Sequence, residues 1–239
     1  MGASREVVIV SGVRTAIGDY GGSLKDFPLV DLAASVVAEA IKRADVDASK
    51  IGQVVMGNVI HTDPRDMYLS RYAAVKGGIP IETPAYTLNR LCGSGLQAIV
   101  CAAQSILCGD TNVALGGGAE SMSRSQYWLP SMRWGQRMND GQVIDAMVGA
   151  LSDPFDSCHM GVTAENVASR WGISREEQDQ LAVESHQRAH MATEEGYFKE
   201  QILPITITHR KQIICLEKDE HIRSDATAES MAKLRTVFK

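Results

Sequence analysis

The 239-residue sequence lacks several features that would assign it to a specialised class of protein. It has no block of five or six like charges, so no nucleic-acid tail and no polybasic membrane patch is expected. No apolar run approaches the roughly 18 residues that a membrane helix needs. The start, MGASREVVIV, lacks a signal-peptide pattern, and Glu6 stands where a myristoylation motif needs Ser or Thr. These absences predict a protein that contacts neither nucleic acid nor membrane.

The cysteines also lack the spacing of a disulfide framework or a zinc knuckle. None of them forms a C-x-x-C pair, and their number is odd: Cys92, Cys101, Cys108, Cys158 and Cys215. This pattern predicts a reducing, cytoplasmic setting and no metal site. The formal net charge is −5 at pH 7, and 44% of the residues are hydrophobic, which is enough for one large or two ordinary domains.

Strand-like and helix-like segments alternate through the first half of the chain. β-branched and apolar runs predict strands over residues 6–12, 53–60, 85–89 and 112–121. Helical spacing of apolar residues predicts helices over 29–44, over 66–77 with Asp66 as its cap, and after Cys92. This alternation predicts an α/β fold, with a largely parallel sheet and helices on both faces.

The composition shifts after about Ser123. Residues 124–156 are rich in Met and Trp, have no clear strand, and are expected to form a long irregular excursion. Helices are predicted over 163–172 and 174–196, the second opened by a capping box of Ser174 and Glu177. Two strands follow, around a polar turn near His209 to Lys211. We therefore divide the chain into an α/β half, 1–122, and a second region, 123–239.

Cys92 stands directly before Gly-Ser-Gly at the mouth of a predicted helix. The helix has one apolar face and otherwise small residues, so we expect it to be buried on most sides, with its first turn inside the protein. Backbone N–H groups without intrahelical partners and the helix dipole favour a thiolate at such a position. The same N–H groups are placed to hold an oxyanion. Cys92 is thus a candidate nucleophile.

The alternative for any cysteine is packing in a core. Cys101 and Cys108 lie seven residues apart on the same predicted helix, which is core spacing, and we expect both to be structural. For Cys92 both interpretations stay open on the residues alone, although the strand–Cys–Gly–x–Gly–helix context favours the nucleophile.

Five ordered motifs resemble those of the thiolases, the acyl-CoA acetyltransferases. They are NRLCGSGLQAI, GGGAESMS, HMGVTAENVA, VVIVSGVRTAIG and EHIRSDATAESMAKLR, and they run from about Glu6 to Lys239. GNVIHTDPRDMYLSR adds a resemblance to bacterial β-ketothiolases of the short-chain, biosynthetic type. The resemblance implies a layered α-β-α fold with a mixed, mostly parallel sheet. It also implies that 123–239 is an incomplete α+β loop domain for coenzyme A (CoA) binding and oligomerisation.

The resemblance further implies a reaction and a set of site residues. Cys92 would take the acyl group of an acyl-CoA as a thioester and pass it to the α-carbon of acetyl-CoA, a Claisen condensation whose reverse is thiolysis of a 3-ketoacyl-CoA. CoA thioesters would be substrates, no cofactor would be tightly bound, and the protein would be a homodimer or homotetramer. The glycines Gly116 to Gly118 would be structural. The resemblance also implies five residues that contact CoA. Leu151 would make an apolar contact, and His159 and Met160 would line the pantetheine and acyl channel. Arg223 and Ser230 would hold the nucleotide.

The sequence also departs from the family. A thiolase subunit is normally longer, with a second α/β half that brings N-E-A-F, G-H-P and C-x-G-G motifs, and none of these occurs here. We therefore expect a truncated or cleaved subunit, or one half of a split enzyme that needs a complementary C-terminal half, nearly inactive alone. The alternative is a non-catalytic thiolase-fold module that binds CoA or a partner chain. A decarboxylating or polyketide-type condensing enzyme is disfavoured, because such enzymes lack the CoA-contacting loop domain.

Overall fold

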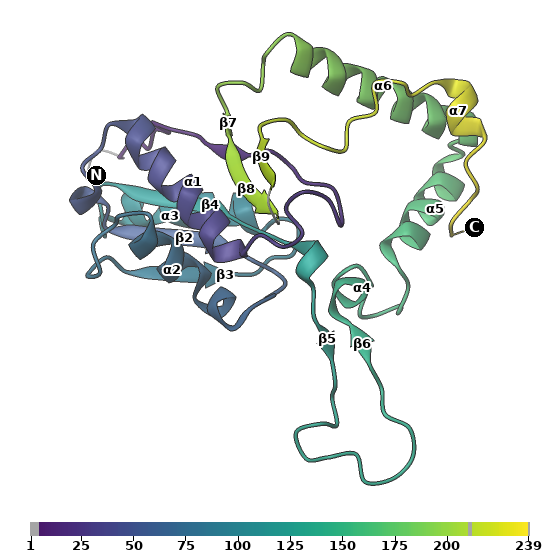
Figure 1. Cartoon of the computed structure of the whole chain (residues 1–239), viewed down its shortest axis with the longest axis horizontal. Coiled ribbons are helices and arrows are strands. Elements are labelled where there is room, and N and C mark those ends of the chain that lie inside the picture. The colour runs from purple at the N-terminus through teal and green to yellow at the C-terminus, as the bar shows by residue number, and fades with distance from the viewer. Residues whose placement is uncertain (1–4, 210–211, 239) are drawn as a thin grey trace.

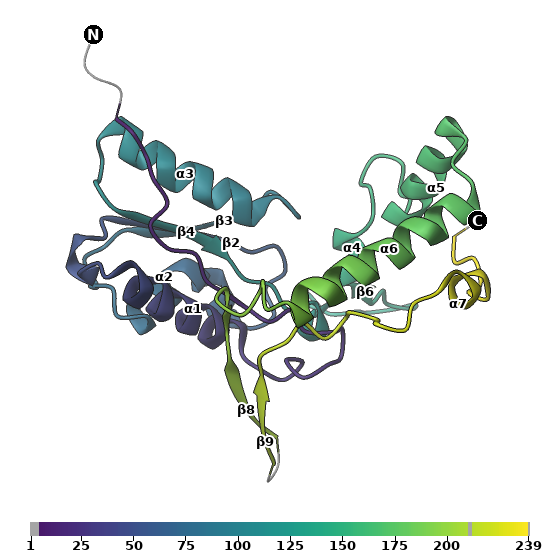
Figure 2. The ribbon, with the colours of Figure 1, turned by 90° about the horizontal axis from the view of Figure 1, so that it is seen from above.

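A three-stranded parallel sheet forms the centre of the first half (Figure 1). The computed structural model describes residues 5–209 and 212–238. The strands are β2 (Gln53–Gly57), β3 (Ala85–Leu88) and β4 (Ala114–Gly118), in the order β3-β2-β4. Helices α1 (Leu29–Ala44) and α2 (Leu69–Lys76) lie on one face and α3 (Ser94–Cys108) on the other (Figure 2). The predicted parallel α/β class is confirmed.

The central strand β2 is buried on both faces. Val54 and Met56 point into the main core with the apolar stripes of α1 and α2, whereas Val55 faces α3. Burying a side chain of this size stabilises a fold by about 1.5–3 kcal/mol. Helix α1 has the predicted bounds because its apolar spacing, early Asp31 and late basic residues all favour the same segment.

Helix α3 packs on the sheet through its small residues, not through its large ones. Ala98 and Ala102 are buried against β2, while Leu96 is 71% and Leu107 50% exposed. Glycines in the strands permit this close packing, because a Cβ on Gly116 would lie 2.7 Å from Ile99 Cα. The prediction that α3 is buried on most sides is therefore wrong, as is the core position of Cys108, which is exposed. The predicted structural role is confirmed for Gly116 and for Gly118, where a Cβ would lie 3.0 Å from Gly57 O. It is not confirmed for Gly117, where a Cβ would make only an ordinary contact.

One apolar window was not expected from the sequence. Within the described residues, Leu91–Cys108 has a mean hydropathy of 1.6, and is long and apolar enough to span a membrane by length and composition alone. Gly, Ser and Gln residues interrupt this window, so the sequence shows no continuous apolar run there. They lower its mean hydropathy only slightly. Core helices of soluble proteins pass the same test, and α3 packs on the sheet through Ala98 and Ala102.

Two predicted elements near the N-terminus need correction. Residues 6–12 form no strand, and Val8, Ile9 and Val10 are exposed, because within the described residues no strand lies beside them to complete a ladder. The helix expected from Asp66 begins instead as a 3-10 turn, η2 (Pro64–Tyr68), which continues into α2. Its cap is Asp63, and Asp66 completes the capping box three residues later. Gly77 ends α2 as predicted.

The second region begins with a long excursion away from the sheet (Figure 1). After η3 (Met122–Arg124), the short strands β5 (Tyr127–Trp128) and β6 (Ile144–Asp145) pair at the base of this excursion. The prediction that residues 124–156 hold no strand is therefore wrong. Helices α4 (Ala146–Ala150), α5 (Met160–Trp171) and α6 (Arg175–Glu194) follow, and the capping box of Ser174 and Glu177 is confirmed.

The chain then returns to the first half. Strand β7 (Ile202–Leu203) pairs in parallel with β1 (Arg14–Thr15), and β8 (Ile205–His209) pairs antiparallel with β9 (Gln212–Leu216). The predicted strand pair is thus confirmed, whereas residues 210 and 211 of the predicted turn lie outside the described residues. The remaining elements are η1 (Ala48–Lys50) and α7 (Ala228–Ala232), which packs on α6. The domain boundary at 122/123 stays a prediction.

Acidic residues after β9 fasten the N-terminal segment to this return. Asp219 accepts two hydrogen bonds from the Arg14 guanidinium, at 2.8 and 3.0 Å, and one from Ile17 N at 2.8 Å. Glu220 accepts from Asp19 N at 2.8 Å. Burial raises the pKa of Asp219, but the bonds from Arg14 and Ile17 outweigh it, so the pKa lies below its ordinary value of 3.8.

We expect Asp219→Ala to lower the free energy of unfolding by about 1.5–3 kcal/mol at pH 7, because hydrogen bonds to charged groups are lost. A lowered folded-state pKa contributes stability that is fully present above the unfolded value and is lost as pH falls through the folded value. Urea unfolding should therefore show the deficit shrinking below about pH 4. Glu217→Ala, an exposed neighbour, is the control. Equal stability of Asp219→Ala and the wild type at pH 7 would show that this fastening contributes nothing.

Candidate active site

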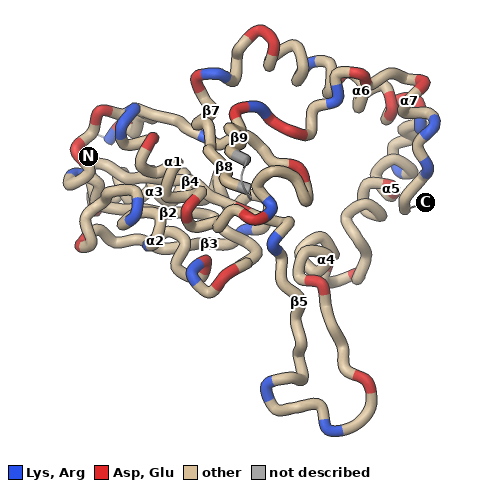
Figure 3. The backbone as a smooth tube through the Cα atoms, viewed as in Figure 1, with Lys and Arg blue, Asp and Glu red and all other residues tan. Residues whose placement is uncertain are grey.

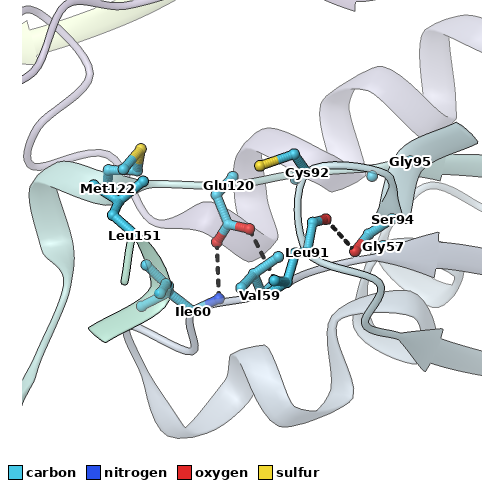
Figure 4. A pocket seen from close by; sticks show the side chains of 13 residues that line it. Gly57, Val59, Ile60, Leu91, Cys92, Ser94, Gly95, Glu120, Met122 and Leu151 are labelled. Atoms are coloured by element: carbon cyan, nitrogen blue, oxygen red, sulfur yellow. Dashed lines mark hydrogen bonds between the residues drawn. The ribbon is translucent and has the colours of Figure 1, made fainter. Parts of the chain in front are cut away.

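The carboxyl ends of the three parallel strands meet at one edge of the sheet. Strand β3 leads into Cys92, β2 into Asn58 to Ile60, and β4 into Ala119 and Glu120. A cavity of about 360 Å³ lies at this edge (Figure 4). Its wall is largely apolar, and it includes Ile60, Leu91, Cys92, Glu120, Met122 and Leu151.

The turn before Cys92 is held in a strained conformation. Leu91 has a φ of 47°, in the left-handed region that a bulky residue rarely adopts. Its N–H donates to Asn89 Oδ1 at 2.9 Å, and its carbonyl accepts from Ser94 Oγ at 2.6 Å (Figure 4). The Ser94 hydroxyl in turn accepts from Arg90 N at 2.8 Å. Strain of this kind persists only where the surroundings over-determine it, so these hydrogen bonds fix the backbone just before Cys92.

Cys92 lies one residue before Gly93, the N-cap of α3. No side chain caps this helix, and its first turn holds no acidic residue, so the positive end of the dipole is uncompensated there. Contrary to the expectation of a buried first turn, Cys92 is exposed, with its sulfur at the cavity (Figure 4). Reactive cysteines are typically accessible and placed near positive charge, so this position favours the nucleophile over core packing.

Glu120 is the one other ionisable side chain among the described residues that line the cavity. Its Oε1 accepts from Ile60 N at 3.1 Å and from Asn58 Nδ2 at 2.9 Å, and its Oε2 accepts from Val59 N at 2.9 Å. Burial of the carboxyl group raises the pKa of Glu120, and the two backbone N–H bonds oppose this. Sequence reasoning missed this residue. The signal available in the sequence was an acidic residue two positions after a glycine-rich strand, at the sheet edge where Cys92 was expected.

Three of the predicted CoA contacts lie together. Leu151 lines the cavity, and its carbonyl accepts from Met160 N at 2.9 Å. His159 pairs its backbone with Ser152 and caps α5, with Nδ1 accepting from Gly161 N at 3.0 Å. Neither His159 nor Met160 lines the cavity, so only Leu151 joins Cys92 at its wall.

The other two predicted contacts lie elsewhere in the second region. Arg223 is exposed, and its backbone N–H donates to His186 Nδ1 on α6 at 3.2 Å. Ser230 is exposed in α7, where its hydroxyl accepts from Thr227 N at 3.0 Å. Neither lines the cavity, and their roles toward CoA stay predictions.

The fold and the site define an α/β protein that presents a cysteine at a helix N-terminus. Residues 7–239 match the N-terminal domain of thiolase. The chain therefore belongs to the thiolase family. It is 61% identical over 235 residues to beta-ketothiolase BktB of Cupriavidus necator, covering 98% of this chain and 60% of that protein. It is 44% identical over 236 residues to an acetyl-CoA acetyltransferase of Chromobacterium violaceum, again covering 98% and 60%.

Solved structures show the same fold. The acetyl-CoA acetyltransferase of Bacillus anthracis superimposes with a TM-score of 0.95 at 42% identity, covering all of this chain and 60% of its own. Human mitochondrial 3-ketoacyl-CoA thiolase in complex with CoA gives a TM-score of 0.90 at 40% identity, covering 96% and 57%. The chain thus spans about 60% of the length of the relatives it matches.

Proposed function

We propose that this protein is an acyl-CoA acetyltransferase of the thiolase type, with Cys92 as the acyl acceptor. The observation that carries the proposal is the position of Cys92, at the N-terminus of α3 and on the wall of a largely apolar cavity. The names of the relatives, beta-ketothiolase and acetyl-CoA acetyltransferase, agree with this chemistry. The substrates proposed are acetyl-CoA and short-chain acyl-CoA or 3-ketoacyl-CoA, with no tightly bound cofactor, in a cytoplasmic homodimer or homotetramer.

The proposed reaction has two halves. In the first, the Cys92 thiolate attacks the carbonyl carbon of an acyl-CoA, a new C–S bond forms, and CoA leaves as a thiolate that takes up a proton. In the second, the α-carbon of acetyl-CoA loses a proton to a base and attacks the Cys92 thioester. A C–C bond forms and the Cys92 thiolate is released. The apolar side chains of Leu91, Met122 and Leu151 would surround the acyl group.

A non-catalytic module that binds CoA or a partner chain is the second candidate. It is favoured by the cavity wall, where the one other ionisable side chain among the described residues is Glu120, whose carboxylate already accepts three N–H donors. The 239 residues contain no N-E-A-F, G-H-P or C-x-G-G motif. In the family these motifs bring the groups that polarise the thioester and move protons. A module of this kind would bind acyl-CoA without forming a thioester on Cys92.

The release of CoA distinguishes the two candidates. On mixing with excess acetyl-CoA, the acetyltransferase should release free CoA up to one equivalent of protein, and prior alkylation of Cys92 with iodoacetamide should abolish this burst. A binding module should release none. A burst that survives alkylation of Cys92 would exclude Cys92 as the acceptor.

We expect Arg223→Ala to raise KM for acyl-CoA with kcat nearly unchanged. Arginine pairs well with phosphate-bearing ligands, and loss of binding that is equal in the ground and transition states changes KM alone. Steady-state kinetics over a range of acyl-CoA concentrations measure this. Arg137→Ala, on the exposed excursion between β5 and β6, is the matched control. A lowered kcat with unaltered KM would contradict the assignment.

A further inference from the structure

The proposed reaction does not use the carboxylate of Glu120, although it lies on the cavity wall beside Cys92. This carboxylate joins the ends of β4 and β2, because Glu120 follows β4 and its three donors follow β2. Figure 4 shows Glu120 with its carboxyl group directed at Val59 and Ile60. The arrangement is therefore a polar cross-link within an otherwise apolar wall.

The segment held by this cross-link is tied on both sides. Asn58 is 1% exposed, and its N–H donates to Leu88 O at the end of β3, at 3.1 Å. Its Nδ2 donates to Glu120 Oε1 at 2.9 Å and to Ala119 O at 3.1 Å. Val59 and Ile60, the next residues, line the cavity, and both donate their backbone N–H to Glu120. Their position thus depends on the carboxylate.

We propose that Glu120 is a positioning residue, which fixes the Val59–Ile60 wall of the Cys92 cavity and thereby sets the size of the acyl group that Cys92 accepts. The acyl role rests on the proposed function, but the positioning of the wall does not. The three N–H donors need acceptors on both sides of the group that binds them. A carboxylate has two acceptor oxygens, whereas a neutral side chain of the same length has only one. Glutamine keeps one acceptor oxygen but directs an NH₂ group at a backbone N–H. Alanine leaves all three donors without this partner.

The rate of alkylation of Cys92 by reagents of different size measures the space in the cavity, and it needs no CoA substrate. In the protein at its natural full length, the rate with iodoacetamide, which is small, is compared with the rate with N-phenylmaleimide, which is bulky, using peptide mass mapping of Cys92. One methylene in an apolar pocket changes discrimination by about 10–200-fold. We therefore expect Glu120→Ala to raise the ratio of the N-phenylmaleimide rate to the iodoacetamide rate by about tenfold, at the lower end of that range. Glu120→Gln should lie between the alanine variant and the wild type. Glu82→Gln, at an exposed position away from the cavity, should match the wild type.

The kinetics with acyl-CoA extend the same test. The ratio of kcat/KM for butyryl-CoA to that for acetyl-CoA should change in the same graded order, Ala more than Gln. An unchanged alkylation ratio in folded Glu120→Ala, judged by circular dichroism and thermal unfolding, would overturn the proposal. If the alanine variant does not fold, an unchanged ratio in Glu120→Gln overturns it equally. If no acyl group forms on Cys92 in any variant, the proposed function fails, and the alkylation ratio still decides the role of Glu120.

Discussion

Cys92→Ser should reduce the rate of thiolysis of acetoacetyl-CoA by about 10⁴–10⁶-fold in the complete enzyme, the range seen when one member of a nucleophile–base unit is removed. The thiolate is the reactive form of cysteine, and a helix N-terminus stabilises it. A serine hydroxyl at the same place has no lowered pKa to exploit and is a weak nucleophile. Initial rates with purified wild type and variant measure the effect.

Cys108→Ser is the matched control, because Cys108 is an exposed cysteine at the far end of the same helix, α3. It should retain the rate of the wild type. A Cys92→Ser protein within tenfold of the wild type would show that another group accepts the acyl chain, and the proposed mechanism would be wrong.

The second large effect concerns the outer face of α3. This helix carries no charged residue (Figure 3), and its large apolar side chains are exposed, with Leu96 at 71% and both Ile99 and Val100 at 41%. Exposed apolar patches of more than a few hundred Å² mark interfaces or aggregation sites. We therefore expect the 239-residue polypeptide, expressed by itself, to associate with copies of itself or with a complementary C-terminal half, and to be nearly inactive.

Adding the remaining C-terminal portion of the BktB relative in trans should then restore activity. General acid–base groups each contribute about 10²–10⁴-fold, and oxyanion donors a further 10²–10³-fold or so, which sets the size of the expected gain. Sedimentation and thiolysis assays before and after mixing measure both effects. Leu96→Asp should weaken the association and the gain, whereas Ile81→Asp, an exposed apolar residue away from α3, should not. A monomer that turns over alone like a full-length thiolase would contradict this account.

Most helices and strands could be predicted from local sequence patterns. The wrong predictions concern elements whose structure depends on packing against distant parts of the chain. Helix α1 was predicted to the residue because spacing and end charges agreed. The strand over 6–12 failed because a strand needs a partner, which its own residues do not reveal. For α3 the apolar spacing identified a face, but not which face packs. Glycines in β2 and β4, which are distant in sequence, brought the alanine face onto the sheet.

The site shows the same division. Cys92 was predictable because its setting is local: a strand, a cysteine, two glycines and a helix. Leu151 was placed by the family resemblance alone, and it lines the same cavity. The cross-link of Glu120 to Val59 and Ile60 was not predictable, because it joins residues about 60 positions apart that meet only once the sheet has formed. The strain at Leu91 likewise depends on hydrogen bonds that the sequence does not display.

The most direct test of the central claim is to identify the acylated residue. The complete enzyme is incubated with acetyl-CoA, quenched in acid to preserve the thioester, digested, and mapped by mass spectrometry. Our account predicts one acetyl group, on the peptide that contains Cys92 and on that cysteine. An acetyl group on Cys101, Cys108 or Cys158 instead, or no acetylated cysteine at all, would contradict it.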